Sequence, residues 1–369
     1  MDERIKKLSK HIVENSIKVQ KGDSVLISSV TLEPSVLVRQ LIRDIVEKKG
    51  IPFVKIIDPT VSSLLSELTD EERIKKLKAL GQNDIDNYDA FISIRYTTND
   101  YENNKTNPEM NKKLGKEMLE IDDVRVNERK WVLLNYPSRL DAYKAKMTTE
   151  DFYDYAFEVM TIDYKDLEER VIPLKKLMEK TDQVRIVAPD TDLTFSIKDI
   201  PAIPCCGSAN IPDGEIYTAP VKNSVNGVIT YNTPSPYQGY IFNQVQLKFK
   251  DGKIIEATSL DNDQKLQEIF DTDEGARYVG EFAIGLNPKI LHAMGDILFD
   301  EKIIGSIHFT PGKCYSDAEN GNDSAIHWDL VLNQRKEYGG GEIYFDDVLI
   351  RKDGKFVLPE LEHLNYDLK

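Results

Sequence analysis

The chain has 369 residues, more than one compact core usually accommodates, so two domains are expected. Hydrophobic residues make up 40% and charged residues 30%, a composition typical of a soluble globular protein. The formal net charge of -15 argues against non-specific binding to nucleic acid or to anionic lipid.

The first half of the chain alternates between helical and strand-like segments. The apolar spacing predicts helices over residues 5–19, 34–49, 61–80 and 108–130, and strands over residues 24–30, 53–57, 90–96 and 131–135. Strands that alternate with long helices predict a mostly parallel sheet with helices on both faces. No GxGxxG motif follows any of these strands, so we expect no dinucleotide site.

The second half follows a different pattern. A charged helical stretch over residues 150–180 is expected to connect the halves, and from Gln183 onwards strand signals come close together. Strands are expected over residues 184–188, 192–197, 227–231, 241–249 and 254–259, and a helix over residues 260–270 with Ser259 as its N-cap. Hairpins are predicted at the Asp-Gly pairs of residues 251–252 and 353–354.

These patterns predict an α/β protein with two domains. The N-terminal domain, residues 1–180 including the connecting helix, is expected to be mostly parallel α/β. The C-terminal domain, residues 181–369, is expected to be β-rich, antiparallel or mixed, and to carry the functional site.

The cysteines and the hydropathy pattern indicate a cytoplasmic protein. No apolar run approaches the roughly 18–20 residues that span a bilayer, and residues 1–10 lack the apolar stretch of a signal peptide. The three cysteines, Cys205, Cys206 and Cys314, contain no CxxC pair, which argues against a disulfide framework or a cysteine-based zinc site.

Two of the five histidines occur in a setting that suits metal binding. His327 and Asp329 lie two residues apart in the apolar run 325–332, so on a strand they project from the same face, with Trp328 packed on the other. His308 lies in a second strand-like run, 303–309. Catalytic zinc and similar ions favour imidazole together with carboxylate. Alternatively, the histidine is structural and pairs with the aspartate for stability.

Two glutamates stand out by their surroundings. Glu215 follows a loop that contains Pro, Asp and Gly and opens directly into an apolar strand, and Glu281 is a single acid among apolar neighbours. A buried carboxylate is costly unless it is paired or ligated. The alternative for each is an ion pair with Arg277 or with a nearby lysine.

Several separated blocks of the chain resemble the M29 family of metallo-aminopeptidases, the aminopeptidase T and aminopeptidase S group. The matching blocks are NIPDGEIYTAP, GARYVGEFAIGLNP, SIHF, GKCYSD and SAIHWDLV, all in the family's order, and the earlier segments RQLIRDIVEKKGIPFVKI and WVLLNYPS are also similar. The resemblance therefore covers nearly the whole chain. The chain departs from the family in being shorter around the linker and the loop 310–325.

The resemblance implies a metal site, a fold and an assembly. The family's metal ligands fall on Glu215, Glu281, His308, His327 and Asp329, and its catalytic tyrosine falls on Tyr315. It also implies an N-terminal α/β domain, a β-rich C-terminal domain that holds the site, and a homodimer that encloses the active sites in a cavity. The shorter loops put the size of that cavity and the preferred peptide length in question.

The implied reaction is removal of the N-terminal residue of a peptide with the help of two divalent ions, Zn, Co or Mn. Two such ions lower the pKa of a water molecule between them and polarise the scissile carbonyl. Glu281 or Asp329 would bridge the ions, Glu281 would also orient the water, and Tyr315 would donate a hydrogen bond to the developing oxyanion. Asp317 and Glu319 lie close by in the sequence, but a solvated loop face explains them equally well.

Two other functions fit the same residues. The first is a two-metal hydrolase of another class, a phosphoesterase or an amidohydrolase, because the same ligand set would serve it. The second is a non-catalytic binding protein on a peptidase fold, which would be expected to have lost ligands.

Overall fold

The structure is a computed structural model that describes residues 2–366. The chain forms two compact units, which are described separately. The first comprises the residues up to Thr161 together with Gly207–Pro212, and the second begins at Ile162, continues to Cys206 and resumes at Asp213. The predicted fold class is confirmed: the first unit holds a parallel sheet and the second is antiparallel and rich in strands.

The sheet of the first unit has five parallel strands in the order β2-β1-β3-β4-β8. Their bounds are β1 Ser24–Val30, β2 Ile51–Ile57, β3 Ala90–Arg95, β4 Lys130–Asn135 and β8 Asn210–Ile211. The four strands predicted in the first half are therefore present. The fifth, β8, comes from a segment that the chain reaches only after it has begun the second unit.

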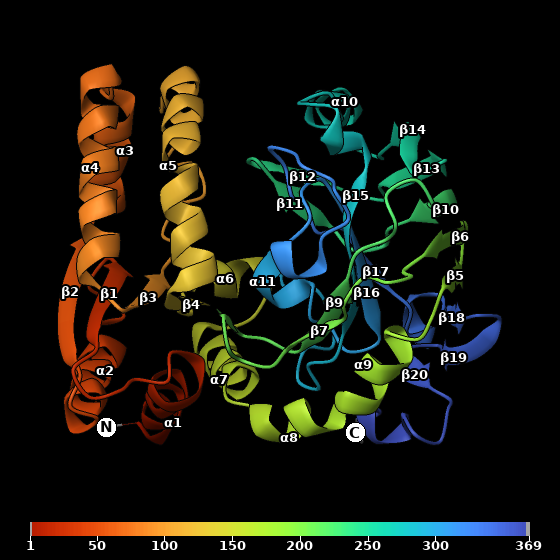
Figure 1. Cartoon of the computed structure of the whole chain (residues 1–369), viewed down its shortest axis with the longest axis horizontal. Helices are drawn as coiled ribbons and strands as arrows, with labels where there is room; N and C mark the ends of the chain where they lie inside the picture. The colour runs from red at the N-terminus through yellow and green to blue at the C-terminus, as the bar shows by residue number, and fades with distance from the viewer. Residues whose placement is uncertain (1, 367–369) are drawn as a thin grey trace. The chain divides into compact units, whose positions relative to one another are not determined.

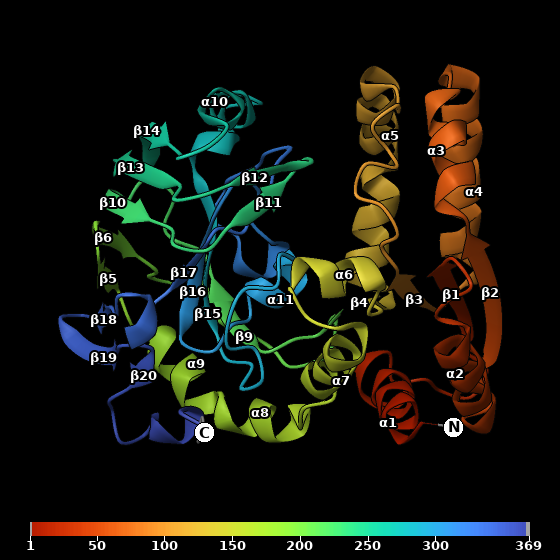
Figure 2. The same ribbon diagram turned by 180° about the vertical axis from the view of Figure 1, so that it is seen from behind.

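The first unit contains two helices where the sequence predicted one over residues 61–80. The helices of this unit are α1 Glu3–His11, α2 Ser35–Glu47, α3 Pro59–Glu67, α4 Glu71–Asn87, α5 Pro108–Glu128, α6 Arg139–Lys144 and α7 Thr149–Met160. The single helix expected over residues 61–80 is wrong, because Asp70 caps a new helix by accepting a hydrogen bond from the backbone N–H of Arg73. Helices α4 and α5 lie side by side (Figures 1 and 2). No helix within residues 2–366 is long and apolar enough to span a membrane.

The second unit contains two antiparallel sheets and a hairpin. The eight-stranded sheet consists of β5 Gln183–Ala188, β6 Thr191–Ser196, β10 Asn226–Thr230, β13 Gln246–Lys250, β14 Lys253–Thr258, β18 Glu342–Phe345, β19 Val348–Lys352 and β20 Lys355–Phe356. The five-stranded sheet consists of β7 Ile203–Cys205, β9 Glu215–Thr218, β15 Val279–Gly285, β16 Ser306–Pro311 and β17 Val331–Asn333. The hairpin is formed by β11 Ser235–Tyr237 and β12 Tyr240–Phe242.

Two predicted boundaries in the second unit need correction, although both predicted Asp-Gly hairpins are confirmed. The strand expected over residues 241–249 is divided between β12 and β13, which belong to different sheets. The helices are α8 Tyr164–Arg170, α9 Ile172–Met178, α10 Asp263–Phe270 and α11 Ile297–Asp300. Helix α10 begins later than predicted, because Asn262, in a left-handed conformation, occupies the N-cap position expected for Ser259.

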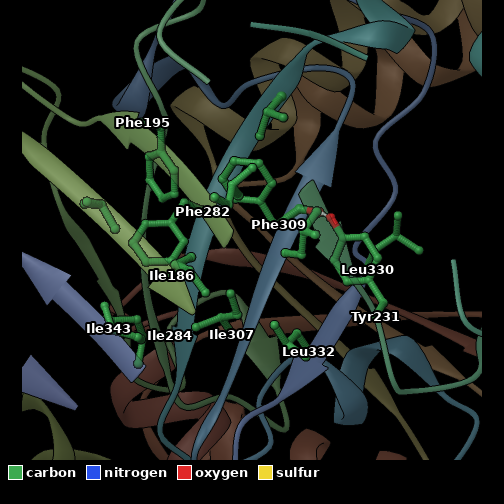
Figure 3. Packing of buried hydrophobic residues seen from close by; sticks show 14 of the residues in the cluster. Ile186, Phe195, Tyr231, Phe282, Ile284, Ile307, Phe309, Leu330, Leu332 and Ile343 are labelled. Carbon is green, nitrogen blue, oxygen red and sulfur yellow. Dashed lines mark hydrogen bonds between the residues drawn. The ribbon is translucent and has the colours of Figure 1, made fainter. Parts of the chain in front are cut away.

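The core of the second unit lies between its two sheets (Figure 3). Phe195 of β6 contacts Phe282 of β15 and Phe309 of β16, with ring centroids 5.0 Å apart in both pairs. Because successive strand residues point to opposite faces, the neighbours of these aromatic residues on β15 and β16 face away from this core. That second face of the five-stranded sheet carries the polar residues described next.

Candidate metal centre

Strand alternation places three of the predicted site residues on one face of the five-stranded sheet. Strand β15 pairs with β9 on one side and with β16 on the other. Ile216, Phe282 and Phe309 are buried in the core between the sheets. Their neighbours Glu215, Glu281 and His308 therefore project from the opposite face, one from each of three adjacent strands.

The segment that carries His327 and Asp329 is not the regular strand that the sequence analysis predicted over residues 325–332. His327 forms only an isolated bridge with Gly312, and regular pairing begins at Val331. Gly312 permits this approach, because a Cβ atom there would lie 2.1 Å from the carbonyl oxygen of Ile326. The expected orientation of the side chains nevertheless holds: Trp328 is buried and stacks on Tyr237, with ring centroids 4.7 Å apart.

The five predicted ligands meet in one cluster. The Nε2 atom of His308 lies 2.9 Å from Oε1 of Glu281 and 3.7 Å from Oε2 of Glu215. The Nε2 atom of His327 lies 3.3 Å from Oε2 of Glu281 and 3.3 Å from Oδ1 of Asp329. Residues distant in the sequence thus place two imidazoles and three carboxylates within reach of the same small ions.

Both histidines use the same ring nitrogen to hold their orientation. The Nδ1 atom of His308 donates a hydrogen bond to the carbonyl oxygen of Glu301 at 3.1 Å, and that of His327 donates to the carbonyl oxygen of Lys313 at 2.8 Å. A carbonyl oxygen can only accept, so each Nδ1 carries a proton and each Nε2 faces the acids. Histidines that ligate metals are typically held in this way.

The electrostatics of the cluster favour a cation. Burial opposes a charged His308, but its hydrogen bond to Glu281 and the surrounding carboxylates outweigh that effect and raise its pKa to about 10. Burial likewise opposes a charged Glu281, yet the two imidazoles lower the pKa of its carboxyl group. In this state protons on the imidazoles balance the carboxylates, and a metal ion can take their place.

Glu215 provides an independent indication that a cation fits here. Its Oε1 atom lies 3.5 Å from the ammonium nitrogen of Lys302, whereas its buried Oε2 atom has no hydrogen-bond partner among residues 2–366. A buried acceptor without a donor is costly, and a cation beside Oε2 would remove that cost. The alternative of an ion pair with a lysine is thus correct for Oε1 of Glu215 but leaves Oε2 unexplained. For Glu281 the alternative is wrong, because its two oxygens face His308 and His327, and Arg277 pairs with Asp271.

Tyr315 lies at the side of the cluster that faces solvent. Its relative exposure is 45%, and its ring packs against His327 with centroids 4.9 Å apart. On its other side the ring of Tyr217 lies 5.4 Å away, and the hydroxyl group of Tyr217 donates a hydrogen bond of 2.7 Å to Asp317. The predicted oxyanion donor is therefore next to a candidate ligand and accessible from outside.

Three residues of the site, Thr310, Glu301 and Lys302, were not predicted from the sequence. Thr310 donates a hydrogen bond of 2.7 Å to Oδ1 of Asp329 and so fixes one candidate ligand. Lys302 is completely buried and contacts the carboxylates of both Glu215 and Glu301. Burial opposes its charge, but these two carboxylates outweigh it and raise the pKa of Lys302. The available signal was the charged triplet Asp300-Glu301-Lys302 between the apolar residues 297–299 and 303–304.

The chain is similar in sequence to several proteins that are named aminopeptidases. The chain is 32% identical over 167 residues to Aminopeptidase 2 of Geobacillus stearothermophilus, which covers 40% of this chain and 37% of that protein. It is 28% identical over 143 residues to Aminopeptidase T of Thermus aquaticus, covering 34% of this chain and 35% of that protein. The chain thus spans little more than a third of the length of these relatives.

Solved structures share the fold along nearly the whole chain. Wild-type AmpT from Thermus thermophilus superimposes with a TM-score of 0.81 at 19% identity, over 96% of this chain and 99% of that one. The 2,5-dihydroxypyridine dioxygenase from Pseudomonas putida KT2440 superimposes with a TM-score of 0.61 at 15% identity, over 97% and 98% of the two chains. The thermophilic metalloprotease (M29) family matches residues 1–356, and the chain belongs to this family.

Proposed function

We propose that this protein is a metal-dependent aminopeptidase that hydrolyses the N-terminal bond of peptides. The observation that carries the proposal is the convergence of two imidazoles, each with Nδ1 tied to a backbone carbonyl, on three buried or half-buried carboxylates. Family membership supports the same function. The proposed ligands of two divalent cations are Glu215, Glu281, His308, His327 and Asp329.

Glu281 is the proposed bridge between the two cations. Its two oxygens face different histidines, Oε1 towards His308 and Oε2 towards His327. Asp329, the other candidate, directs Oδ1 towards His327 and accepts a hydrogen bond from Thr310 with the same oxygen. A carboxylate shared between two imidazoles is the better placed of the two to serve two ions.

The remaining chemistry belongs to residues of the chain. Bound divalent ions would supply Lewis acidity towards a water molecule and the scissile carbonyl. Glu281, buried at the centre of the cluster, would orient that water and accept its proton. The hydroxyl group of Tyr315 would donate a hydrogen bond to the developing oxyanion from the solvent side. A donor set of imidazole and carboxylate suits Zn, Co or Mn.

Hydrolysis of a panel of aminoacyl-p-nitroanilides tests the proposal. Protein stripped of metal should be inactive and should regain activity with Co²⁺, Zn²⁺ or Mn²⁺. Glu281→Gln and His327→Ala should each lower kcat/KM by at least about a hundredfold, because each removes a group that the ions need. Glu256→Gln, an exposed acid of β14, is the control and should behave like the wild type. Near-full activity of either site variant would refute the ligand assignment.

The same assay separates the alternatives. A phosphoesterase would hydrolyse p-nitrophenyl phosphate in place of the anilides. A non-catalytic binding protein would show no turnover of either substrate after reconstitution with metal. Elemental analysis before and after reconstitution would count the ions and so test the proposed number of two.

We also propose that the protein is a cytoplasmic homodimer. Strand β2 supports the assembly: it lies at the edge of its sheet, and Phe53, Val54 and Ile56 are each about 45% exposed. An exposed apolar edge strand is usually covered. The three cysteines are free thiols, as expected in a reducing compartment. Light scattering coupled to size-exclusion chromatography should give twice the monomer mass of 42.1 kDa.

A further inference from the structure

Lys302 is a completely buried lysine next to the candidate metal ligands. It lies two residues after the end of α11, and its ammonium group contacts the carboxylates of Glu215 and Glu301. All three side chains are buried. A buried lysine is costly unless it is paired, so this arrangement calls for a reason beyond packing.

The contact with Lys302 distinguishes the two oxygens of Glu215. Oε1 lies 3.5 Å from the ammonium nitrogen, and Oε2 is turned towards Nε2 of His308 at 3.7 Å. Oε2 has no hydrogen-bond donor within the described part of the chain. The ammonium group thus holds the carboxylate by one oxygen and leaves the other directed into the cluster.

The ammonium group of Lys302 occupies the side of Glu215 that carries Oε1, where a metal ion could otherwise bind. Cys205 and Asp213 lie close to Glu215, and together they offer three ligand atoms within 4.8 Å of one another. The charge of Lys302 acts on Asp213 as well as on Glu215. Because the ammonium group of Lys302 already lies beside these acids, a metal ion is expected only on the side of Glu215 that carries Oε2.

We propose that Lys302 is a positioning residue for the metal centre: it fixes Oε1 of Glu215 so that Oε2 is presented to the ion. The inference rests on the proposed function. The preceding residue, Glu301, orients a second proposed ligand, because its backbone carbonyl accepts a hydrogen bond from Nδ1 of His308. Two consecutive residues thus orient two of the five proposed ligands, His308 and Glu215.

A purely structural role makes different predictions. If Lys302 served only to neutralise buried acids, its replacement would lower stability but leave the metal affinity of the folded protein unchanged. If it positions Glu215, its replacement weakens metal binding, and the effect depends on the carboxylate of Glu215. The affinity for Co²⁺ or Zn²⁺, measured by competition with a chromophoric chelator, separates the two roles without an activity assay.

The first comparison uses Lys302→Met, which keeps the length of the side chain and removes its charge, and Lys302→Arg, which keeps the charge. Lys248→Met, at an exposed position of β13, is the matched control. We expect about ten- to hundredfold weaker binding of Co²⁺ by Lys302→Met, partial recovery by Lys302→Arg and no change for the control. A shift in the visible absorption spectrum of bound Co²⁺ should accompany the loss. Wild-type affinity of folded Lys302→Met would overturn the proposal.

A double-mutant cycle gives a second test that does not depend on the folding of the methionine variant. Lys302→Gln retains a neutral donor and should weaken Co²⁺ binding less than Lys302→Met. In a Glu215→Gln background, Lys302→Gln should have no further effect, because the carboxylate it positions is gone. Additive losses in the double variant would contradict the proposal. If the wild-type protein binds neither Co²⁺ nor Zn²⁺, the proposed function itself fails, and this inference fails with it.

Discussion

The two histidines of the cluster differ in their access to solvent. The side chain of His308 is 1% exposed, whereas that of His327 is 24% exposed and lies against Tyr315. Under the proposed function, a substrate would reach the cluster from the side of His327 and Tyr315. The deeper half, with Glu215, His308 and Lys302, is buried, and we propose that it holds the ligands in place.

Replacement of Tyr315 by Phe tests the proposed oxyanion donor. The variant keeps the ring that packs on His327 and loses only the hydroxyl group. We expect kcat to fall by about 10²–10³-fold with little change in KM, because the hydrogen bond is made chiefly in the transition state. Steady-state kinetics on aminoacyl-p-nitroanilides measures both constants. Tyr338→Phe is the control, and an unchanged kcat for Tyr315→Phe would remove Tyr315 from the mechanism.

Thr310 offers a second test at the level of single residues. Its hydroxyl group fixes Asp329 through a hydrogen bond of 2.7 Å. Thr310→Val keeps the shape of the side chain and removes this donor, so metal affinity should fall by about tenfold or more. Thr310→Ser keeps the hydroxyl group and should remain within a few fold of the wild type. Isothermal titration with Zn²⁺ compares the three proteins, and equal affinities would show that Asp329 does not need this bond.

The strands β9, β15 and β16 serve the core and the site at once. One face of each contributes to the packing between the two sheets, and the other supplies Glu215, Glu281 or His308. Because the two faces alternate along the same backbone, the packing of one face fixes the position of the other. The rigidity of the cluster is therefore a property of these strands rather than of its loops.

Phe195→Ala tests this link between core and site. Phe195 contacts both Phe282 and Phe309 and belongs to the opposite sheet, away from every proposed ligand. The cavity should lower the free energy of unfolding by about 3–5 kcal/mol. Denaturation in urea measures the loss, and Val348→Ala, at an exposed position of β19, should change stability by less than about 1 kcal/mol. An equal effect of both variants would contradict the assigned core.

The sequence predicts these elements better than it predicts the contacts between them. The alternation of Glu281 with Phe282, and of His327 with Trp328, is visible in the residue order and places the ligands on one face. The pairing of Lys302 with Glu215 depends on which strands become neighbours, and periodicity does not contain that information. For the same reason Thr310 could not be matched with Asp329, although both lie close to predicted ligands.

At the scale of the whole molecule, the fold does not determine the reaction. The same architecture extends over 97% of the chain in its match to a dioxygenase and over 96% in its match to AmpT. A shared fold supports many chemistries, so the function has to be argued from the cluster of imidazoles and carboxylates. The division into domains at residue 180 stays a prediction.

The charge balance of the cluster predicts how the molecule responds to pH. The pKa of His308 is raised from its ordinary 6.5 to about 10, so the folded, metal-free protein holds this proton more tightly than the unfolded chain. Its contribution to stability is complete below pH 6.5 and is lost as the pH rises towards 10. Metal binding displaces the proton, so metal affinity should rise by up to about tenfold per pH unit for each proton released.

Titrations with Zn²⁺ and thermal melts between pH 6 and pH 9 check both expectations. The metal-free protein should lose stability across this range, and the metal-loaded protein should lose less because its histidines no longer carry the displaced protons. His308→Gln should remove the part of the pH dependence that comes from His308 and leave the part from His327, whose pKa is raised because Asp329 and Glu281 outweigh the effect of burial. A metal affinity that is independent of pH would show that the imidazoles are not ligands.

The insertion of Gly207–Pro212 into the first unit has a consequence for biosynthesis. When the residues up to Thr161 have left the ribosome, β4 can pair with β3 but still lacks its second neighbour, because β8 follows only after β5, β6 and β7 have been made. Domains usually fold in the order of their synthesis. The edge of the nascent N-terminal sheet therefore stays unpaired until β8 is made, and the codons for β8 are read only a few codons before the one for Glu215.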